Sequence, residues 1–369
     1  MTIQVQAIAA AVKAAEADWS WEENFLTAMS SAERRHYLGY VPGPGEPTLQ
    51  EAERAAQANY EAMQAAGASR AAAAPSAFDL RSVGGKNYIT AVKNQGNCGS
   101  CVAFGSVATV EGTIRWRRSQ PDLAIDLSEA HLFYCLARKQ GRTCNNGWWV
   151  PPALDSFRDT GVGDEACYPY TAGDQNCTNL CSDWQNRAVK ITAWKELNTA
   201  AAMKDWLSTN GPLAACFTVY DDFFAYKSGV YRHVTGDLAG GHCVCCVGYD
   251  DAAGCWICKN SWDTTWGDKG FFRIAYGDCG IDARMWAVET PKSDVTPTWL
   301  EKKQITGLWV TNEKRNAFVY VDGVGWRKIV ADNDATFLAM VTALASAKVG
   351  KSPVNLRIEG EGIKELYVF

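Results

Sequence analysis

The cysteines of this chain are confined to its middle. All 14 fall between Cys98 and Cys279, and none lies in the first 97 or the last 90 residues. One central unit therefore carries all the sulfur chemistry of the protein. Cysteines at this density favour disulfides and an oxidising compartment, so we expect a secreted or otherwise extracytoplasmic protein. No basic cluster followed by an apolar core is visible in the first 20 residues, so we see no secretory signal there.

Length and charge narrow the classes of protein further. At 369 residues the chain is long enough for two or three folded units. Hydrophobic residues make up 47% and charged residues 21%, as in ordinary globular proteins, which argues against wholesale disorder. The net charge of −5, with acidic and basic residues interspersed, argues against a nucleic-acid partner. No run of 18 apolar residues exists that would span a membrane.

The first 76 residues differ from the rest. They are rich in alanine, lack cysteine and carry about nine acidic against five basic residues. Two capping boxes, Ser20-x-x-Glu23 and Thr48-x-x-Glu51, predict helices that begin there. The prolines and glycines of residues 38–45 cannot continue a helix, and the small residues at 67–75 predict a linker open to cleavage.

The remainder predicts two further units. Residues 101–118 predict a helix with one apolar face, and residues 242–248, 255–258 and 270–274 predict strands, which together indicate an α+β unit of two lobes. After a polar linker at 291–297, strands are expected at 307–311, 317–322, 355–359 and 364–369, with a helix at 332–348. We place the units at 1–76, 77–290 and 298–369, the last being a small α/β accessory domain.

The strongest chemical signal surrounds one cysteine, in the segment Gln95-Gly96-Asn97-Cys98-Gly99-Ser100-Cys101. Its glycines predict a tight turn before a helix that begins at Cys101, where the helix dipole favours a thiolate. A cysteine with an ordinary pKa near 8.5 would be only about 3% thiolate at pH 7. A nearby base is therefore needed to activate it.

The chain offers that base in a suitable setting. Only four histidines exist, and His242 follows two glycines at the start of an apolar strand, where small residues leave room for a substrate. Asn260 lies 18 residues further on and offers an amide to orient the imidazole, and Trp262 offers an indole to cover that hydrogen bond. Cysteine, histidine and asparagine form a known nucleophile, base and orienter set.

These motifs resemble the active-site motifs of the papain family of cysteine proteases. Cys101 and His242 are 141 residues apart (242 − 101), within the family's range of roughly 130–150. The resemblance covers residues 77–289, and its other matching segments are Phe78-Asp79-Leu80-Arg81, Leu127-Ser128-Glu129, Cys144-Asn145-Asn146-Gly147, Tyr168-Pro169-Tyr170 and Cys279-Gly280-Ile281. It implies a two-lobed papain-like fold with a helical left lobe and a β-barrel-like right lobe.

The resemblance also implies roles for the motif residues. Cys101 would attack the peptide carbonyl and form an acyl-enzyme, and His242 would pair with the thiolate and protonate the leaving amine. Asn260 would hold the imidazole under Trp262. Gln95 and the backbone amide of Cys101 would form the oxyanion hole.

Substrate contacts follow from the same resemblance. Gly147 would present backbone hydrogen bonds to an extended peptide, and Gly241 and Trp262 would line the cleft beside the catalytic groups. Arg284 stands at the position that closes the base of the main substrate pocket, where a guanidinium would favour an acidic side chain at the second residue before the cut. The alternative is an arginine that points to solvent.

The other cysteines divide into pairs and free thiols. Cys98–Cys144 and Cys135–Cys177 match the family's conserved bridges, and elimination leaves Cys167–Cys181 as a plausible third. Seven cysteines remain, so at least one is unpaired; no cysteine before His242 matches the usual partner of Cys279. Cys255-x-x-Cys258 has the spacing of a zinc site. Alternation along a strand would separate such ligands, so we favour buried free thiols and expect no metal or cofactor.

The sequence leaves the roles of the two flanking units, residues 1–76 and 298–369, less closely defined. We predict that residues 1–76, which lack the long helical signature of typical papain-family propeptides, form an inhibitory prosegment with residues 40–45 in the cleft near Cys101. In the C-terminal module, Trp309, Tyr320 and Trp326 either line a site for an unknown ligand or form the module's core, and the small size of the unit favours the core.

The overall prediction is a cysteine endopeptidase made as a zymogen. Its partners would be protein or peptide substrates and its own prosegment as an intramolecular inhibitor. Two alternatives stay open. One is an exopeptidase or transferase that uses the same thiolate chemistry, and the other is an inactive papain-like domain that acts as a binding protein.

Overall fold

The computed structural model describes residues 2–65, 74–291, 298–311, 315–331, 333–359 and 362–369. The chain divides into two compact units, Met1–Thr290 and Pro291–Phe369. Most of the two predicted linkers, at 67–75 and 291–297, lies outside the described residues. Within the described part of the chain, no helix is long and apolar enough to cross a membrane.

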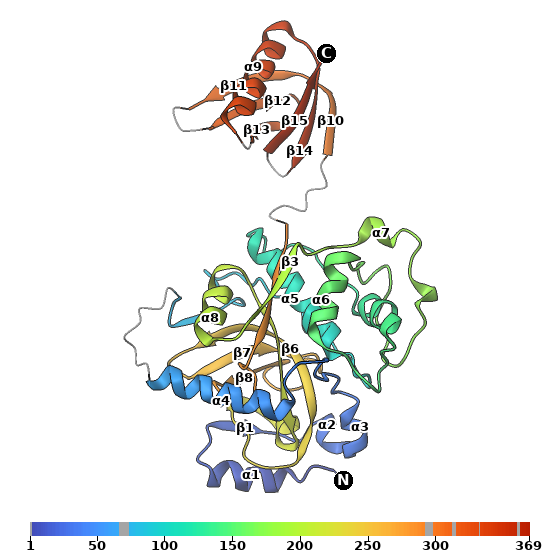
Figure 1. Cartoon of the computed structure of the whole chain (residues 1–369), viewed down its shortest axis with the longest axis vertical. Coiled ribbons are helices and arrows are strands. Elements are labelled where there is room, and N and C mark those ends of the chain that lie inside the picture. The colour runs from blue at the N-terminus through green and yellow to red at the C-terminus, as the bar shows by residue number, and fades with distance from the viewer. Residues whose placement is uncertain (1, 66–73, 292–297, 312–314, 332, 360–361) are drawn as a thin grey trace. The chain divides into compact units, whose positions relative to one another are not determined.

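One lobe of the first unit is built around helix α5 (Cys101–Arg117) (Figure 1). Residues 101–114 are buried on every side of this helix, so the prediction of a single apolar face was too narrow. Around it pack α6 (Val150–Asp159) and the π-helical turn η2 (His131–Leu136), with α7 (Trp184–Arg187) further along the same lobe. This lobe presents the N-terminus of α5, and with it Cys101, to the other lobe.

The other lobe is a mostly antiparallel sheet. Its strand order is β1-β5-β8-β7-β6-β4-β9-β3, with β2 (Ala77–Asp79) paired to β6. The α+β class is as predicted, but the barrel-like lobe is an open sheet, because no pairing among the described strands joins β1 to β3. The bounds along this order are Trp19–Trp21, Tyr226–Tyr231, Phe271–Ala275, Cys255–Lys259, Leu238–Asp250, Leu213–Tyr220, Met285–Glu289 and Ala193–Leu197; helix α8 (Ala200–Thr209) packs beside β6.

The two lobes meet where α5 packs on β6. A Cβ atom at Gly105 would lie 3.0 Å from the Cys243 sulfur and 3.1 Å from the Val244 carbonyl oxygen. Only glycine therefore lets the helix approach the strand this closely. That approach brings the helix turn that begins at Cys101 beside the strand segment that carries His242.

The N-terminal segment folds onto the sheet rather than standing apart. It contains α1 (Val5–Ala14), β1, α2 (Phe25–Ala28), α3 (Ser31–Arg35) and α4 (Leu49–Ala65). The predicted capping box at Ser20 is wrong: residues 19–21 form a strand that pairs with β5, and Asn24 caps α2 instead. Pairing with β5 and burial of Trp19 against Tyr231, at a centroid distance of 5.2 Å, override the local helix signal. The box at Thr48 is confirmed, since Thr48 and Glu51 bond each other's backbone amides.

The C-terminal unit is a six-stranded sheet covered on one face by α9 (Asp334–Gly350) (Figure 1). Its strands are β10 (Thr298–Lys303), β11 (Ile305–Val310), β12 (Ala317–Val321), β13 (Gly325–Ile329), β14 (Val354–Glu359) and β15 (Gly362–Val368). The sequence reading missed β10 and β13. The core consists of aliphatic residues such as Val319, Leu344 and Leu356. The favoured interpretation of Trp309, Tyr320 and Trp326 as core residues was wrong, because all three are exposed.

Candidate active site

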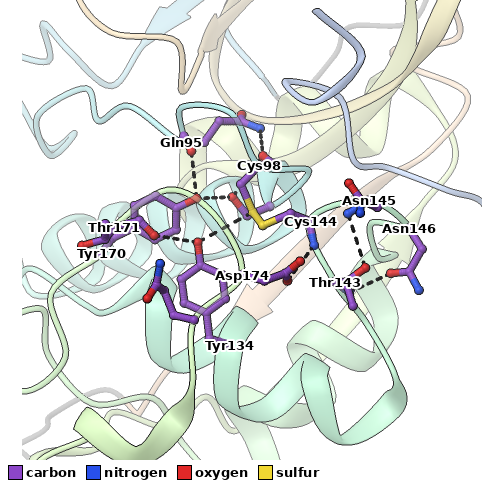
Figure 2. Close-up of a disulfide and its surroundings, with 12 residues drawn as sticks. Gln95, Cys98, Tyr134, Thr143, Cys144, Asn145, Asn146, Tyr170, Thr171 and Asp174 are labelled. Carbon is purple, nitrogen blue, oxygen red and sulfur yellow. Dashed lines mark hydrogen bonds between the residues drawn. A yellow bond between two sulfur atoms is a disulfide. The ribbon is translucent and has the colours of Figure 1, made fainter. Parts of the chain in front are cut away.

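Cys101 is held in place by a cross-linked turn. Gly96 has φ +57°, a left-handed conformation that suits glycine, and the chain then turns into α5. The Cys98–Cys144 disulfide ties this turn to the loop that precedes Gly147 (Figure 2). The hydroxyl of Tyr170 donates to the Gln95 carbonyl at 2.8 Å (Figure 2) and lies 2.7 Å from the Ser100 hydroxyl. These bonds fix the backbone on both sides of Cys98.

The Cys101 thiol is fully buried in this form of the protein. Burial raises its pKa, and the nearby Cys243 thiol adds to this effect; the backbone amides of Cys243, Gly39 and Val102 oppose it. The causes that raise the pKa of Cys101 outweigh those that lower it, so the thiol is protonated at neutral pH. The contact with Cys243 also shows that the sulfur lies beside the residue that follows His242.

His242 has the hydrogen bond that a catalytic imidazole needs. Its Nε2 lies 2.7 Å from Asn260 Oδ1, an oxygen that also accepts from the Ser261 backbone amide at 2.8 Å. Because Asn260 presents an acceptor, Nε2 carries the hydrogen and Nδ1 is left with a lone pair. Nδ1 is buried and has no hydrogen-bond partner among the described residues. Trp262 stacks on the ring at a centroid distance of 4.6 Å.

The imidazole is neutral at physiological pH. Burial lowers the pKa of His242 to about 4, and the hydrogen bond to Asn260 offsets only part of that shift. Cys101 and His242 are thus both uncharged in this form of the protein. Burial is the largest cause of both pKa shifts, so the segment that covers these two side chains also keeps them uncharged.

Gln95 is oriented by a residue whose role the sequence did not reveal. The Ser261 hydroxyl donates to Gln95 Oε1 at 2.6 Å, which turns the amide nitrogen towards the cleft. That nitrogen donates to the carbonyl of Tyr37 at 3.1 Å and to that of Cys98 at 2.9 Å. Trp262 Nε1 also donates to the Tyr37 carbonyl, at 3.3 Å. The Tyr37 carbonyl, which belongs to the N-terminal segment, therefore accepts a hydrogen bond from the Gln95 amide that was predicted to stabilise the oxyanion.

The N-terminal segment crosses the cleft at residues 38–41. The Tyr40 amide donates to the Gly241 carbonyl at 3.1 Å, and the Val41 amide donates to the Trp148 carbonyl at 3.0 Å. The Trp148 amide donates in return to the Gly39 carbonyl at 2.8 Å. The predicted contact at residues 40–45 thus begins two residues too late, although Tyr40 and Val41 belong to it. Gly43 does lie over Trp149, where a Cβ atom would meet its ring at 2.4 Å.

Glycines make this crossing possible. A Cβ atom at Gly39 would lie 2.0 Å from the Gly99 carbonyl oxygen, and one at Gly147 would lie 2.0 Å from the Gly39 carbonyl oxygen. Gly147 was predicted to supply backbone hydrogen bonds. In this structure Trp148 supplies them, and Gly147 supplies the space that lets the two chains approach.

Arg284 does not point freely into solvent. Its guanidinium lies 3.7 Å from Glu46 of the N-terminal segment, 3.7 Å from Glu196 and 3.5 Å from the Tyr40 hydroxyl. The Tyr40 ring is buried, and it lines the same small pocket as Arg284, Cys216 and Ala283. The arginine therefore sits in a pocket that already holds a side chain of the bound segment.

The remaining cysteines and histidines have structural surroundings. The three predicted disulfides, Cys98–Cys144, Cys135–Cys177 and Cys167–Cys181, are all present. Every other cysteine is a buried free thiol, including Cys255, Cys258 and Cys279. Within the described ranges, His, Cys, Asp and Glu side chains form no group of three that could hold a metal ion. His131 accepts from the Gly163 amide at 3.0 Å, and His233 lies 3.1 Å from Asp222.

The comparison with protein families agrees with this geometry. The family model described as "Papain family cysteine protease" matches residues 74–288, more than half of the chain. The chain belongs to this family. "Cathepsin B-like CP3" of Giardia intestinalis is 37% identical over 227 residues, which cover 58% of this chain and 73% of the relative. "Cathepsin B" of Dictyostelium discoideum is 34% identical over 214 residues, which cover 52% and 67%.

Solved structures give the same fold for this papain-family chain. "proCathepsin B S9 from Trypanosoma congolense" superposes with a TM-score of 0.64 and 24% identity, covering 79% of this chain and 99% of that one. "Recombinant stem bromelain precursor" has a TM-score of 0.59 and 26% identity, covering 78% and 88%. Both matches cover more of the chain than the family model does, so the structural likeness extends beyond residues 74–288.

The close approach of Gly39 to Gly99 yields one prediction. In Gly39→Ala the added methyl group would collide with the Gly99 carbonyl, and such overpacking costs about 1–3 kcal/mol. We expect Cys101 in the uncleaved chain to react with iodoacetamide about tenfold faster or more, measured by mass spectrometry of the Cys101 peptide. Gly350→Ala is the control, because this glycine lies in α9 and a Cβ atom there comes no closer than 3.4 Å to its nearest neighbour, the Ser352 hydroxyl. Equal labelling rates in both variants would contradict the prediction.

The lowered pKa of His242 yields a second prediction. In a Cys101→Ala chain, where His242 cannot take a proton from the thiol, its folded value of about 4 lies below its ordinary value of 6.5, so opening of the cleft takes up a proton between these two pH values. Hydrogen-exchange protection of the Tyr40 and Val41 amides, corrected for intrinsic rates, should fall as pH drops from about 6.5 to about 4. When His242→Gln is added to Cys101→Ala, this part of the pH dependence should disappear. An unchanged dependence in that variant would show that other groups control opening.

Proposed function

We propose that this papain-family chain is the zymogen of a cysteine endopeptidase, in which residues 1–76 inhibit the catalytic domain at 77–290. One observation carries the proposal: residues 38–41 run between Trp148 and Gly241 and are bonded to both, and the Gly39 amide lies against the Cys101 sulfur. A site that binds main chain on both walls is suited to peptides.

The proposed chemistry assigns a step to each group. Once the segment leaves, water enters the cleft and the burial that suppresses both charges is removed, so a proton can pass from Cys101 to His242 Nδ1. The thiolate attacks the substrate carbonyl, and Gln95 Nε2 stabilises the oxyanion in the place now taken by the Tyr37 carbonyl. His242 then protonates the leaving amine, and water hydrolyses the acyl-enzyme. Asn260 keeps the imidazole in the required tautomer.

Endopeptidase activity is favoured over trimming of chain ends by the path of the segment. The bound chain contacts Gln95 and Trp262 through Tyr37, and it continues beyond the cleft to Glu46 beside Arg284. This continuous path supports a cleft that also accepts the interior of a substrate chain. An exopeptidase or transferase remains the second candidate, and an inactive binding domain the third. The three disulfides support an extracytoplasmic compartment.

A single experiment separates these candidates. Full-length protein would be incubated with reductant at about pH 5, with an irreversible epoxide inhibitor of thiol proteases as the label. We expect self-processing near residue 77, labelling at Cys101, and then cleavage of a peptide blocked at both ends. Cys101→Ala should abolish all three, and Cys255→Ala, which removes a buried free thiol, should retain them. Release of terminal residues alone would indicate an exopeptidase, and no labelling would indicate an inactive domain.

Arg284 yields a prediction of specificity. With Tyr40 and Glu46 gone, the guanidinium keeps the Trp286 ring, at a centroid distance of 5.3 Å, and the partly exposed Glu196 as neighbours from the catalytic domain. The processed enzyme should therefore cleave a peptide with Glu at the second position before the cut about tenfold faster than its Leu counterpart. Arg284→Leu should reverse the ratio of kcat/KM values, and Arg284→Lys should preserve its direction. A strong preference of the wild type for Leu would refute this role.

A further inference from the structure

We propose that the open face of the C-terminal sheet binds a neutral polysaccharide chain through Trp309, Tyr320 and Trp326. This inference concerns a site apart from the proteolytic chemistry and does not depend on it. It rests on where the rings lie, how they are supported and which charges surround them.

The rings share the sheet face that α9 leaves uncovered. On β12, Ala317, Val319 and Val321 are buried in the core with residues of α9, so Phe318 and Tyr320 point the other way. The strand register places Trp309 opposite Phe318, and Tyr320 opposite Trp326. Four aromatic rings from three adjacent strands therefore stand on one face.

These rings are accessible and ordered. The exposed fractions are 56% for Trp309, 48% for Trp326 and 40% for Tyr320, whereas most tryptophans of the first unit are buried. Trp309 stacks on Phe318 at a centroid distance of 5.3 Å, and Tyr320 meets Trp326 edge to face at 5.5 Å. Each ring is thus held by a neighbour and does not need to be ordered when a ligand arrives.

A glycine completes this surface, which we call the aromatic shelf (Trp309, Phe318, Tyr320, Trp326). A Cβ atom at Gly307 would lie 3.0 Å from the outer edge of the Trp326 indole. The indole therefore reaches from β13 across β12 to β11, and it can do so because position 307 has no side chain. A side chain there would lift the ring away from the sheet.

The charges beside the shelf argue for a neutral ligand. Lys328 already lies over the Phe318 ring at 5.7 Å, and on the same sheet face Arg357 pairs with Glu365. Residues 298–369 contain ten lysines and arginines against eight acidic residues. A polyanion such as nucleic acid, or an anionic membrane, would require a larger basic excess on this face.

Sugar rings match what the shelf offers. A pyranose ring has a flat face of C–H groups and an edge of hydroxyls, so it can stack on an indole and hydrogen-bond at its rim. Tryptophan and tyrosine provide the same combination of apolar face and polar tip, at a small cost in side-chain entropy. Because the rings extend over three strands, a chain of several sugars gains more contacts than a single sugar.

Native affinity electrophoresis of the full chain tests this proposal. The chain would carry Cys101→Ala to prevent proteolysis, and the gels would contain hydroxyethyl cellulose, galactomannan or no polymer. We expect retardation by at least one polymer relative to the polymer-free gel. The double variant Trp309→Ala/Trp326→Ala should bind about tenfold more weakly or worse. Leu338→Ala, which removes a residue 66% exposed on α9, should bind like the parent.

Several outcomes would overturn the proposal. They are the absence of retardation by both polymers, and retardation that the double variant retains while its circular dichroism is unchanged. Salt-sensitive binding of a fluorescent oligothymidine that the same variant abolishes would assign the shelf to nucleic acid. Concentration-dependent dimers in sedimentation that the variant abolishes would assign it to a second copy of the chain. Trp309→Phe, which keeps a ring, should retain most of the polysaccharide binding and so separates loss of stacking from loss of fold.

Discussion

The removal of water from one sulfur and one imidazole underlies the state of this protein. The proposed chemistry needs Cys101 and His242 as a charged pair, and residues 38–41 exclude the solvent that would stabilise those charges. The side chains of the site can therefore be in place while the proposed reaction is suppressed. The hydrogen bond between His242 and Asn260 is already made, so activation needs no rebuilding of the site.

Residues 37–46 of the same segment contact, one after another, the groups that are proposed to bind substrate. The Tyr37 carbonyl accepts from Gln95, the Tyr40 amide and the Trp148 amide complete main-chain bonds on the two walls, and Glu46 faces Arg284. Each of these contacts is modest by itself. Together they follow from close approach of backbones, which the glycines at 39, 99 and 147 permit. Close backbone packing rather than strong ion pairing thus holds the segment in the proposed inhibited state.

Local patterns in the sequence predicted the parts of the site that depend on local structure. The glycine turn before Cys101, the helix that follows and the strand after Gly241 are all present, and so are the three disulfides, which the resemblance and elimination together suggested. Features that depend on distant partners were missed. Strand β1 forms because β5 lies beside it, and the role of Ser261 emerges only when Gln95, 166 residues away, reaches its hydroxyl. The exposure of Trp309 likewise depends on which sheet face α9 covers.

The pairing of β1 with β5 has a consequence for the processed form. In the intact chain β1 shields the outer edge of the sheet, and Trp19 covers the rings of Tyr226 and Tyr231. Loss of the first 76 residues would leave β5 as an exposed edge strand, with unpaired backbone amides and with the rings of Tyr226 and Tyr231 more exposed to solvent. The processed form would then be more prone to aggregation than the intact chain.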